Sequence, residues 1–404
     1  MKILFSITNL ELGGAQKFVL NLAAALSEKH DVTIYDHRPE DCNIDFINHE
    51  CSSRVKIIAY AKGKLKLKLI WKLNKIFAQF GLIKNFRDKL NNKKFANTLK
   101  KNKFDIVHSH LSLADILTAT ALQGSNITYV TTLHGCYDID DAADIDNYIS
   151  DSQKNIPFLL SRLNGIIYLT AKSAEPFLNN RHYNPNKTEL KKINNALNTK
   201  IVYTCHSTES QPALTNNSFV FGMVSRGLKE KGWQEALDAY VIASAELGRN
   251  GIPTKFIAIG GGEYLDTLKI GYEHNNSIVF MGQLENPASI IKTFDVGILP
   301  SYRECFPNVI IEYINADLAI IATDVGDIPE MVKEIESTCA ILIKKNKNVP
   351  PSVSEIAHAM IQIASDKNLC DKLKNVSKLI KTKFSIETCV NNHINFYKDL
   401  LKCK

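Results

Sequence analysis

Cations and carboxylates follow the apolar runs of this 404-residue sequence at several points. Arg226 and Lys231 come after one such run, and Glu304 and Glu312 come after another. An arginine fork and a lysine point charge both suit a diphosphate, and a carboxylate accepts hydrogen bonds from hydroxyl groups. Solvated surface charge is the ordinary alternative for each of these side chains. The residue types therefore indicate a candidate site for a diphosphate and for a hydroxyl-rich group.

Glycines and histidines occupy similar places in the first half of the sequence. The loop Gly13–Gln16 lies between an apolar run and a helical pattern, where backbone N–H groups and a helix N-terminus can approach an anion. A plain tight turn is the alternative for these glycines. His134 follows another apolar run, and His108 and His110 end a third. A histidine at such a point is either structural or faces a ligand.

Short apolar runs alternate with helical patterns, which predicts parallel sheets with crossover helices. In the first half we expect strands at Lys2–Ile7, Asp31–Tyr35, Phe104–His108, Ile127–Thr132, Gly165–Leu169 and Leu190–Asn194. In the second half we expect strands at Phe219–Val224, Lys255–Ile259, Ser277–Met281, Asp295–Leu299 and Leu318–Ala322. Candidate residues therefore lie at the carboxyl ends of strands, where doubly wound sheets bind their ligands.

A polar stretch near residues 199–218 separates the two halves. We therefore predict an α/β protein of two Rossmann-like domains, 1–198 and 199–384, with a cleft between them. Residues 385–404 form an amphipathic pattern, and we expect this last helix to pack back on the N-terminal domain.

The net charge of +7 is unevenly distributed. Residues 62–104 hold fourteen basic residues and one acid, which leaves −6 for the rest of the chain. Helical spacing gathers the apolar residues of this basic amphipathic insert into a stripe of Leu65, Leu69, Leu73, Ile76, Phe77, Phe80 and Ile83. The lysines of the opposite face are Lys64, Lys68, Lys72 and Lys75. The pattern suits an anionic membrane surface. The alternative is that the stripe packs on the first domain. We expect no nucleic acid partner.

We expect no targeting segment in this sequence. The N-terminus enters a strand rather than a cleavage site, and no apolar run is long enough to span a bilayer. The nine cysteines include no C-x-x-C pair, as expected for reduced thiols. We expect a cytoplasmic protein, peripheral on the inner face of the cytoplasmic membrane.

Taken in order, the motifs resemble glycosyltransferase family 4, whose members are retaining enzymes of the GT-B fold. The stretch SYRECFPNVIIEYINADLAIIATDVGDIPEMV at 301–332 resembles the signature region of the family, in which two glutamates lie eight residues apart. Other stretches that resemble family motifs are Gly13–Gln16, Phe104–His110, Thr131–Gly135, Ile193–Asn198 and Phe221–Gly232.

The resemblance implies a role for each matching position. Arg226 and Lys231 would bind the donor diphosphate, with the backbone of Gly14. Glu304 would bind the donor sugar with the main chain of Phe306, Asn308 and Val309, and Glu304 and His134 would be the catalytic residues. Glu312 would hold the ribose, and the backbone around Gly282 and Leu284 would frame the base. No metal and no cofactor are expected.

The implied activity is transfer of a hexose or N-acetylhexosamine from a nucleotide sugar, most simply a UDP-sugar, with retention at the anomeric carbon. The implied acceptor is a membrane-anchored or lipid-linked glycan of bacterial surface polysaccharide, lipopolysaccharide or glycoprotein-glycan biosynthesis. A sugar-nucleotide epimerase of the same fold and a non-catalytic nucleotide-sugar binder are the alternatives.

Overall fold

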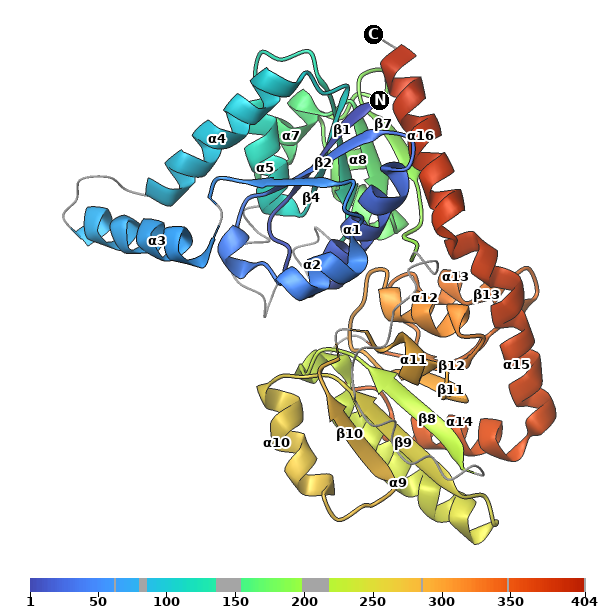
Figure 1. Cartoon of the computed structure of the whole chain (residues 1–404). Helices are drawn as coiled ribbons and strands as arrows, with labels where there is room; N and C mark the ends of the chain where they lie inside the picture. The colour runs from blue at the N-terminus through green and yellow to red at the C-terminus, as the bar shows by residue number, and fades with distance from the viewer. Residues whose placement is uncertain are drawn as a thin grey trace. The chain divides into compact units, whose positions relative to one another are not determined.

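The computed structural model describes residues 1–61, 63–79, 86–135, 154–197, 218–284, 286–346 and 349–402. The chain divides into two compact units (Figure 1). Unit 1 comprises Met1–Ile201 together with Ile386–Lys404, and unit 2 comprises Val202–Ser385. The division falls next to the predicted boundaries at 198 and 384, and the last helix belongs to unit 1.

Unit 1 is built on a seven-stranded parallel sheet with the order β3-β2-β1-β4-β5-β6-β7. The strands are β1 (Lys2–Ile7), β2 (Asp31–Asp36), β3 (Lys56–Ala59), β4 (Ile106–His110), β5 (Thr128–Leu133), β6 (Gly165–Tyr168) and β7 (Glu189–Lys192). Its helices are α1 (Gly14–Leu26), α2 (Ile44–Glu50), α3 (Lys64–Gln79), α4 (Phe86–Asn102), α5 (Ser112–Ala121), α7 (Ile156–Arg162), α8 (Ala171–Leu178) and α16 (Ile386–Lys402).

Each face of this sheet has its own apolar core. Helices α1 and α16 cover one face, and α4, α5 and α7 cover the other (Figure 1). Alternate residues of β4 point to opposite faces, so Ile106 lies in the first core and Val107 in the second. His108 and His110 share the side of Ile106, which places two imidazole rings under α1 and α16.

The C-terminal helix α16 packs directly against α1 and the sheet. Gly165 of β6 makes this close approach possible, because a Cβ there would lie 2.7 Å from Leu400 and 2.8 Å from Phe396. The helix also brings two polar side chains, His393 and Tyr397, into the core of unit 1, where both are fully buried.

The basic insert contains the helix that its stripe predicts and a second helix after it. The described part forms two helices, and α4 is a core helix whose Phe95 and Leu99 are buried in unit 1. In α3, the buried residue is Ile70, which packs on Tyr60, while Leu65 is 85% exposed. Within the predicted stripe, Leu65, Leu69 and Ile76 are exposed, while Leu73 and Phe77 are partly buried. Lys62, Phe80 and Ile83 lie outside the described residues.

Unit 2 is built on a six-stranded parallel sheet with the order β10-β9-β8-β11-β12-β15. These strands are β8 (Phe219–Val224), β9 (Thr254–Ile259), β10 (Ile278–Gly282), β11 (Val296–Leu299), β12 (Ala319–Thr323) and β15 (Ala340–Ile343). Its helices are α9 (Trp233–Arg249), α10 (Glu263–Tyr272), α11 (Ala288–Ile291), α12 (Asn308–Asn315), α13 (Ile328–Met331), α14 (Val353–Ser365) and α15 (Lys367–Ile380). The short turns η3 (Lys229–Lys231) and η4 (Lys381–Phe384) precede α9 and α16.

The prediction of two parallel-sheet α/β domains is confirmed, and every predicted strand overlaps an observed one. The missed strands are β3 and β15, together with the two-residue pair β13 (Lys333–Glu334) and β14 (Ser337–Thr338). In unit 2, α12 begins at Asn308 with Pro307 as its N-cap, and α13 is a single short turn.

Candidate functional site

In unit 2, the loops after β8 and β9 approach each other backbone to backbone. The Gly227 N–H donates to the Gly261 carbonyl at 2.8 Å. The close approach of the two loops requires glycine at position 260, since a Cβ on Gly260 would lie 2.1 Å from the Ser225 carbonyl oxygen. This contact fixes the start of the segment that carries both candidate diphosphate ligands, Arg226 and Lys231.

Lys231 and Glu304 lie together although 73 residues separate them in the sequence. The Lys231 ammonium donates to Glu304 Oε1 at 2.8 Å, and the Ser301 hydroxyl donates to the same oxygen at 2.8 Å. The side chains of Lys231 and Glu304 are only 13% and 12% exposed, respectively. Glu304 Oε2 has no hydrogen-bond partner among the described residues, so it can accept from a ligand hydroxyl.

Two glycines with positive φ hold the backbone around this ion pair. Gly232 has a φ of +76°, and a Cβ there would lie 2.0 Å from the Pro300 carbonyl oxygen. Gly326 has a φ of +60°, and a Cβ there would lie 2.3 Å from the Glu304 carbonyl oxygen. A side chain at either position would displace the backbone that presents Lys231 or Glu304.

The loops after β11 and β12 support each other at the same edge of the sheet. The Thr323 hydroxyl donates to the Ser301 carbonyl at 2.6 Å, and the Asp327 N–H donates to the Cys305 carbonyl at 2.9 Å. Because both ends of the segment 301–305 are tied to the neighbouring loop, Glu304 lies on a supported backbone.

Arg226 differs from Lys231, because its side chain is exposed. Its backbone is fixed, since the indole N–H of the fully buried Trp233 donates to the Arg226 carbonyl at 2.8 Å. Because the Arg226 side chain makes no hydrogen bond to any residue that the structure describes, the exposed guanidinium can swing to a phosphate.

The remaining predicted positions of unit 2 lie at the first turns of α12 and at the end of β10. Asn308 and Val309 open α12, and the preceding Phe306 is buried. Glu312 lies one turn further along α12 and is half-buried.

At the end of β10, the carbonyl of Gly282 accepts from the Gly260 N–H at 2.9 Å, which links this segment to the loop after β9. Leu284 follows in the same segment and is half-buried.

The loop after β1 in unit 1 leads into α1 at Gly14, which is exposed. Gln16 folds back over the loop, where its amide donates to Asn9 at 2.8 Å. A Cβ on Gly13 would lie 2.4 Å from the Gln16 side-chain oxygen. The loop is therefore stabilised by its own side chains, with Gly14 at the start of α1.

His134 directly follows β5 and lies beside His110, which ends β4. His110 Nδ1 and His134 Nε2 are 2.8 Å apart and share a hydrogen bond. The Phe18 ring of α1 packs edge-on against both imidazoles. Nearby, His108 is hydrogen-bonded through Nδ1 to the Tyr397 hydroxyl at 2.7 Å.

Burial keeps these imidazoles neutral. It lowers the pKa of His134 to about 3, with a smaller effect of His393. Burial also holds the pKa of His110 well below its usual range, with the neighbouring histidines His108, His134 and His393 adding to the effect. Four histidines therefore form an uncharged cluster in unit 1, whereas the ion pair of unit 2 is charged.

Two family descriptions match the chain, one on each half. Residues 12–190 match the model of Glycosyltransferase Family 4, and residues 207–379 match that of Glycosyl transferases group 1. The chain belongs to glycosyltransferase family 4. This glycosyltransferase has the two parallel-sheet α/β units of the GT-B fold, and the predicted resemblance is confirmed.

Two curated proteins from bacteria are similar to the glycosyltransferase. It is 26% identical, over 75% of its length and 77% of the relative's, to the UDP-Gal:α-D-GlcNAc-diphosphoundecaprenol α-1,3-galactosyltransferase of Escherichia coli. It is 24% identical to the capsular polysaccharide biosynthesis glycosyltransferase CapM of Staphylococcus aureus, over 48% of its length and 50% of CapM.

Solved structures share the fold at lower identity. HepE of Anabaena in complex with UDP and glucose superposes with a TM-score of 0.71 at 17% identity, over 98% of this chain and 99% of HepE. The sucrose-phosphate synthase of Thermosynechococcus elongatus superposes with a TM-score of 0.73 at 20% identity, over the full length of both chains.

Sequence reasoning selected Lys231 and Glu304 separately, and the structure brings them into contact within the glycosyltransferase. It gave no role to Ser301 or Gly326, which touch or support Glu304. Both follow the end of a predicted strand, which is the signal that pointed to their neighbours. Sequence reasoning noted His110 by position alone, and its bond to His134 emerges only from the pairing of β4 with β5.

Proposed function

We propose that this protein is a retaining glycosyltransferase that moves a hexose or N-acetylhexosamine from a UDP-sugar to a lipid-linked glycan. Its role would be in bacterial surface polysaccharide, lipopolysaccharide or glycoprotein-glycan biosynthesis. The observation that carries the proposal is the supported Lys231–Glu304 pair, which combines a cation for a diphosphate with a carboxylate for sugar hydroxyls. The UDP-galactose donor of the Escherichia coli relative and the UDP and UDP-glucose complexes of HepE support a UDP-sugar donor.

The reaction needs stabilisation of charge on the leaving group. When the bond between the sugar C1 and the diphosphate oxygen breaks, negative charge grows on that oxygen. Lys231 has N–H groups to spare beyond its bond to Glu304, and Arg226 adds a second cation, so both can stabilise this charge more in the transition state than before it.

The proposed transfer then completes on the same face of the sugar. The acceptor hydroxyl oxygen forms the new bond to C1, and its proton passes to the departing diphosphate. Glu304 Oε2 would accept from a sugar hydroxyl, while first-turn N–H groups of α12 at Asn308 and Val309 would donate to others. Glu312 would hold the ribose, the backbone at Gly282 and Leu284 would frame the base, and His134 would face the sugar. Because two cations serve the diphosphate, we propose that the reaction requires no metal and no cofactor.

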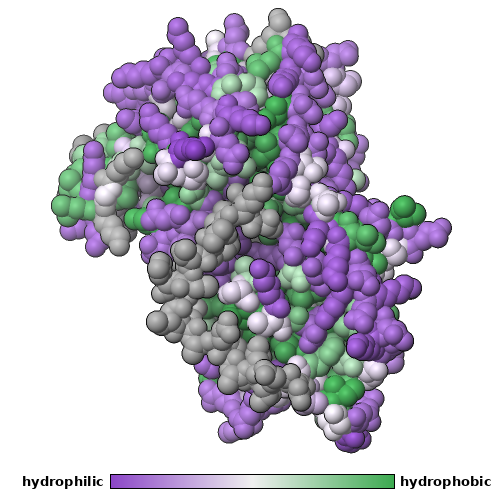
Figure 2. Space-filling model, turned by 45° about the vertical axis from the view of Figure 1, so that its right-hand side comes forward, coloured by the Kyte–Doolittle hydropathy of each residue, from purple (hydrophilic) through white to green (hydrophobic). Residues whose placement is uncertain are grey.

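The acceptor end of the proposal rests on the outward face of α3. Leu65, Leu69 and Ile76 are exposed along this helix, and Lys68 and Lys72 flank them. Figure 2 shows hydrophobic surface beside hydrophilic surface on the helix at the left edge of the view. An apolar ridge bordered by lysines matches an anionic lipid surface, since the apolar side chains enter the interface and the lysines meet the headgroups.

Trp71 adds to this surface. Its ring is half exposed, and the Lys75 ammonium lies 3.8 Å from its centre. Tryptophan suits the boundary between headgroups and acyl chains, because its ring is apolar and its N–H can stay hydrated. None of the described helices is long and apolar enough to cross a bilayer. We therefore propose that the protein lies on the cytoplasmic membrane at its inner face.

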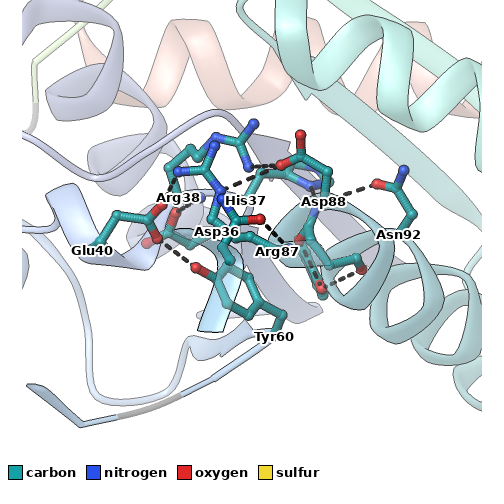
Figure 3. Close-up of polar contacts among 11 residues, drawn as sticks. Asp36, His37, Arg38, Glu40, Tyr60, Arg87, Asp88 and Asn92 are labelled. Atoms are coloured by element: carbon teal, nitrogen blue, oxygen red, sulfur yellow. Dashed lines mark hydrogen bonds and ion pairs between the residues drawn. The ribbon is translucent and has the colours of Figure 1, made fainter. Parts of the chain in front are cut away.

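A polar network holds the α3–α4 region to the sheet (Figure 3). Arg38 pairs with Asp88 at 2.8 Å, and Arg87 pairs with Glu40 at 2.8 Å. The Tyr60 hydroxyl donates to the second oxygen of Glu40 at 2.7 Å. The network joins the start of α4 to the segments that follow β2 and β3. Because the Arg87 N–H also donates to Asn74 of α3 at 3.1 Å, membrane contact through α3 would hold unit 1 at the lipid surface.

Activity tests the first part of the proposal. UDP-galactose, UDP-glucose and UDP-N-acetylglucosamine are offered with vesicles containing GlcNAc-diphosphoundecaprenol. We expect release of UDP that depends on the acceptor, with an α-linked disaccharide lipid as product. An epimerised UDP-sugar formed without acceptor would instead identify an epimerase. Donor binding without turnover would identify a binder.

Cosedimentation tests the membrane part. We expect binding to phosphatidylglycerol vesicles that falls with salt, and a loss of binding in Leu69→Glu, whose side chain is 55% exposed in the wild type. Ile242→Glu is the matched control, because Ile242 is 51% exposed on α9 of unit 2. Equal loss in both variants, or equal binding to neutral vesicles, contradicts the assignment to α3.

A further inference from the structure

The hydrogen bond between His110 and His134 leaves each ring with one other nitrogen. His134 Nδ1 has no hydrogen-bond partner among the described residues, so it is the nitrogen of this ring that a ligand can meet. His110 Nε2 is buried, and it too has no partner in the described part of the chain. The proton arrangement in this pair therefore decides what His134 offers to a ligand.

Two arrangements are possible for a neutral pair, because each ring carries one proton. If His134 Nε2 donates, His110 must hold its own proton on the buried Nε2, as an N–H without an acceptor. If His110 Nδ1 donates, its buried Nε2 is a bare lone pair, and the proton of His134 lies on Nδ1. Buried N–H groups without an acceptor are rarer than incompletely satisfied acceptors, which favours the second arrangement.

We propose that His110 is a positioning residue that fixes His134 as the Nδ1–H tautomer, so that His134 presents a hydrogen-bond donor to the sugar rather than a base. The inference rests on the proposed function, which places His134 at the donor sugar. It deepens that function, because a neutral donor toward a sugar hydroxyl can orient the substrate without removing a proton from it.

The surroundings of His110 hold the ring in place. Phe5 and Phe18 pack on it, and the ring of His108 lies 4.2 Å away, centre to centre. His108 is itself fixed at both nitrogens, by the Tyr397 hydroxyl and by the Thr132 hydroxyl at 2.8 Å. With its neighbours fixed, His110 has little freedom to turn its Nδ1 away from His134.

The remaining titratable groups of the cluster come from α16 and carry no charge. His393 donates from Nδ1 to the Cys389 carbonyl at 2.8 Å, and burial lowers its pKa to about 4. Burial raises the pKa of the Cys389 thiol and holds that of Tyr397 well above its usual range. At neutral pH no charge from these side chains competes for the proton shared by His110 and His134.

The tautomer can be observed directly without any substrate. Two-bond proton–nitrogen spectra of the full-length protein labelled with ¹⁵N-histidine distinguish a bare Nε2 from a protonated one. Loss of one set of signals in His134→Gln assigns them. We expect His134 to show a protonated Nδ1 and a bare Nε2 at pH 7. A protonated Nε2 would overturn the proposal.

An isosteric pair of variants separates positioning from packing. In His110→Asn, the side-chain amide occupies the place of Nδ1 and can donate to His134 Nε2, so the tautomer should persist. In His110→Asp, the carboxylate can only accept, so the proton of His134 should move to Nε2. Transfer from UDP-galactose to GlcNAc-diphosphoundecaprenol should fall about 10- to 100-fold further in His110→Asp than in His110→Asn.

His108→Asn is the matched control for lost packing, since His108 is equally buried on the same strand and does not bond to His134. Its spectrum at His134 should equal that of the wild type. Equal activities of His110→Asn and His110→Asp, with unchanged His134 signals in both, would refute the positioning role. If His110→Asp does not fold, the wild-type spectrum alone decides. If His134→Gln transfers at the wild-type rate, the proposed function fails at His134, while the tautomer result stands.

Discussion

The two units carry polar residues at the carboxyl edges of similar sheets, but the residues differ in charge. In unit 2, Lys231 and Glu304 form an ion pair that is about one-eighth exposed. In unit 1, His110 and His134 form a neutral pair, because burial lowers both pKa values below the neutral range. One unit therefore offers charge, and the other offers oriented hydrogen bonds.

This difference matches the two demands of glycosyl transfer from a nucleotide sugar. The leaving diphosphate gains charge, and preorganised cations stabilise it strongly. The sugar ring is uncharged apart from its reacting carbon, and a neutral donor can orient its hydroxyls without attracting the diphosphate. We therefore expect substitutions in unit 2 to lower the rate of transfer most. Substitutions in unit 1 should alter the orientation of the sugar and the dependence of the protein on pH.

The largest effect is expected from Lys231→Ala. Removal of this cation leaves the developing charge on the diphosphate poorly stabilised, and it leaves Glu304 without its ion-pair partner. We expect kcat for transfer from UDP-galactose to fall about 100- to 1,000-fold. Steady-state assays of UDP release in the presence of acceptor measure the change.

Lys229→Ala is the control for this prediction. Lys229 lies in the same short turn η3 and is exposed, but it makes no ion pair among the described residues. Its removal should leave kcat within about twofold of the wild type. Similar losses in both variants would show that general positive charge, rather than the pair with Glu304, matters in unit 2.

A smaller effect is expected from Gly326→Ala. A positive φ costs a non-glycine residue about 1–2 kcal/mol, and here the new Cβ would also press on the Glu304 carbonyl. We expect a lower Tm together with a severalfold higher KM for UDP-galactose. Gly251→Ala separates the two causes, because Gly251 has a φ of +75° with nothing within 4 Å of its Cβ position. That control should lose stability alone, and a raised KM there would remove the special role of Gly326.

The sequence was sufficient to predict most of the strands and the main candidate residues of both units. Apolar runs gave the strands, and the residues after them gave Lys231, Glu304 and His134, because parallel sheets gather such residues at one edge. The contact of Lys231 with Glu304 could not be derived from spacing, since it depends on which strands lie next to each other and on the glycines at 232 and 326.

The basic insert shows the limit of helical periodicity. Spacing identified an apolar stripe correctly as a pattern, but it could not say which side of α3 meets the domain. Tyr60 and Leu90 select Ile70 as the buried contact, so Leu65 and Leu69 turn outward. A partner from elsewhere in the chain decides the orientation, and a local pattern does not contain it.

The smallest effect is expected from His393→Leu in the cluster of unit 1. His393 has a pKa of about 4 in the folded protein and about 6.5 when unfolded, so the folded state binds fewer protons between these values. Its contribution to stability is therefore complete above pH 6.5 and is lost as the pH falls toward 4. The leucine variant should unfold with a weaker dependence on pH in this window. At pH 7 it should lose only about 1 kcal/mol, because it loses the Nδ1 donation to the Cys389 carbonyl, while Nε2 has no partner in the described residues. Denaturant unfolding at pH 5 and pH 7 measures both, with His182→Leu as an exposed control in the same unit. An unchanged pH dependence would mean that His393 is hydrated in solution, and the neutral character assigned to the unit 1 cluster would then be wrong at this residue.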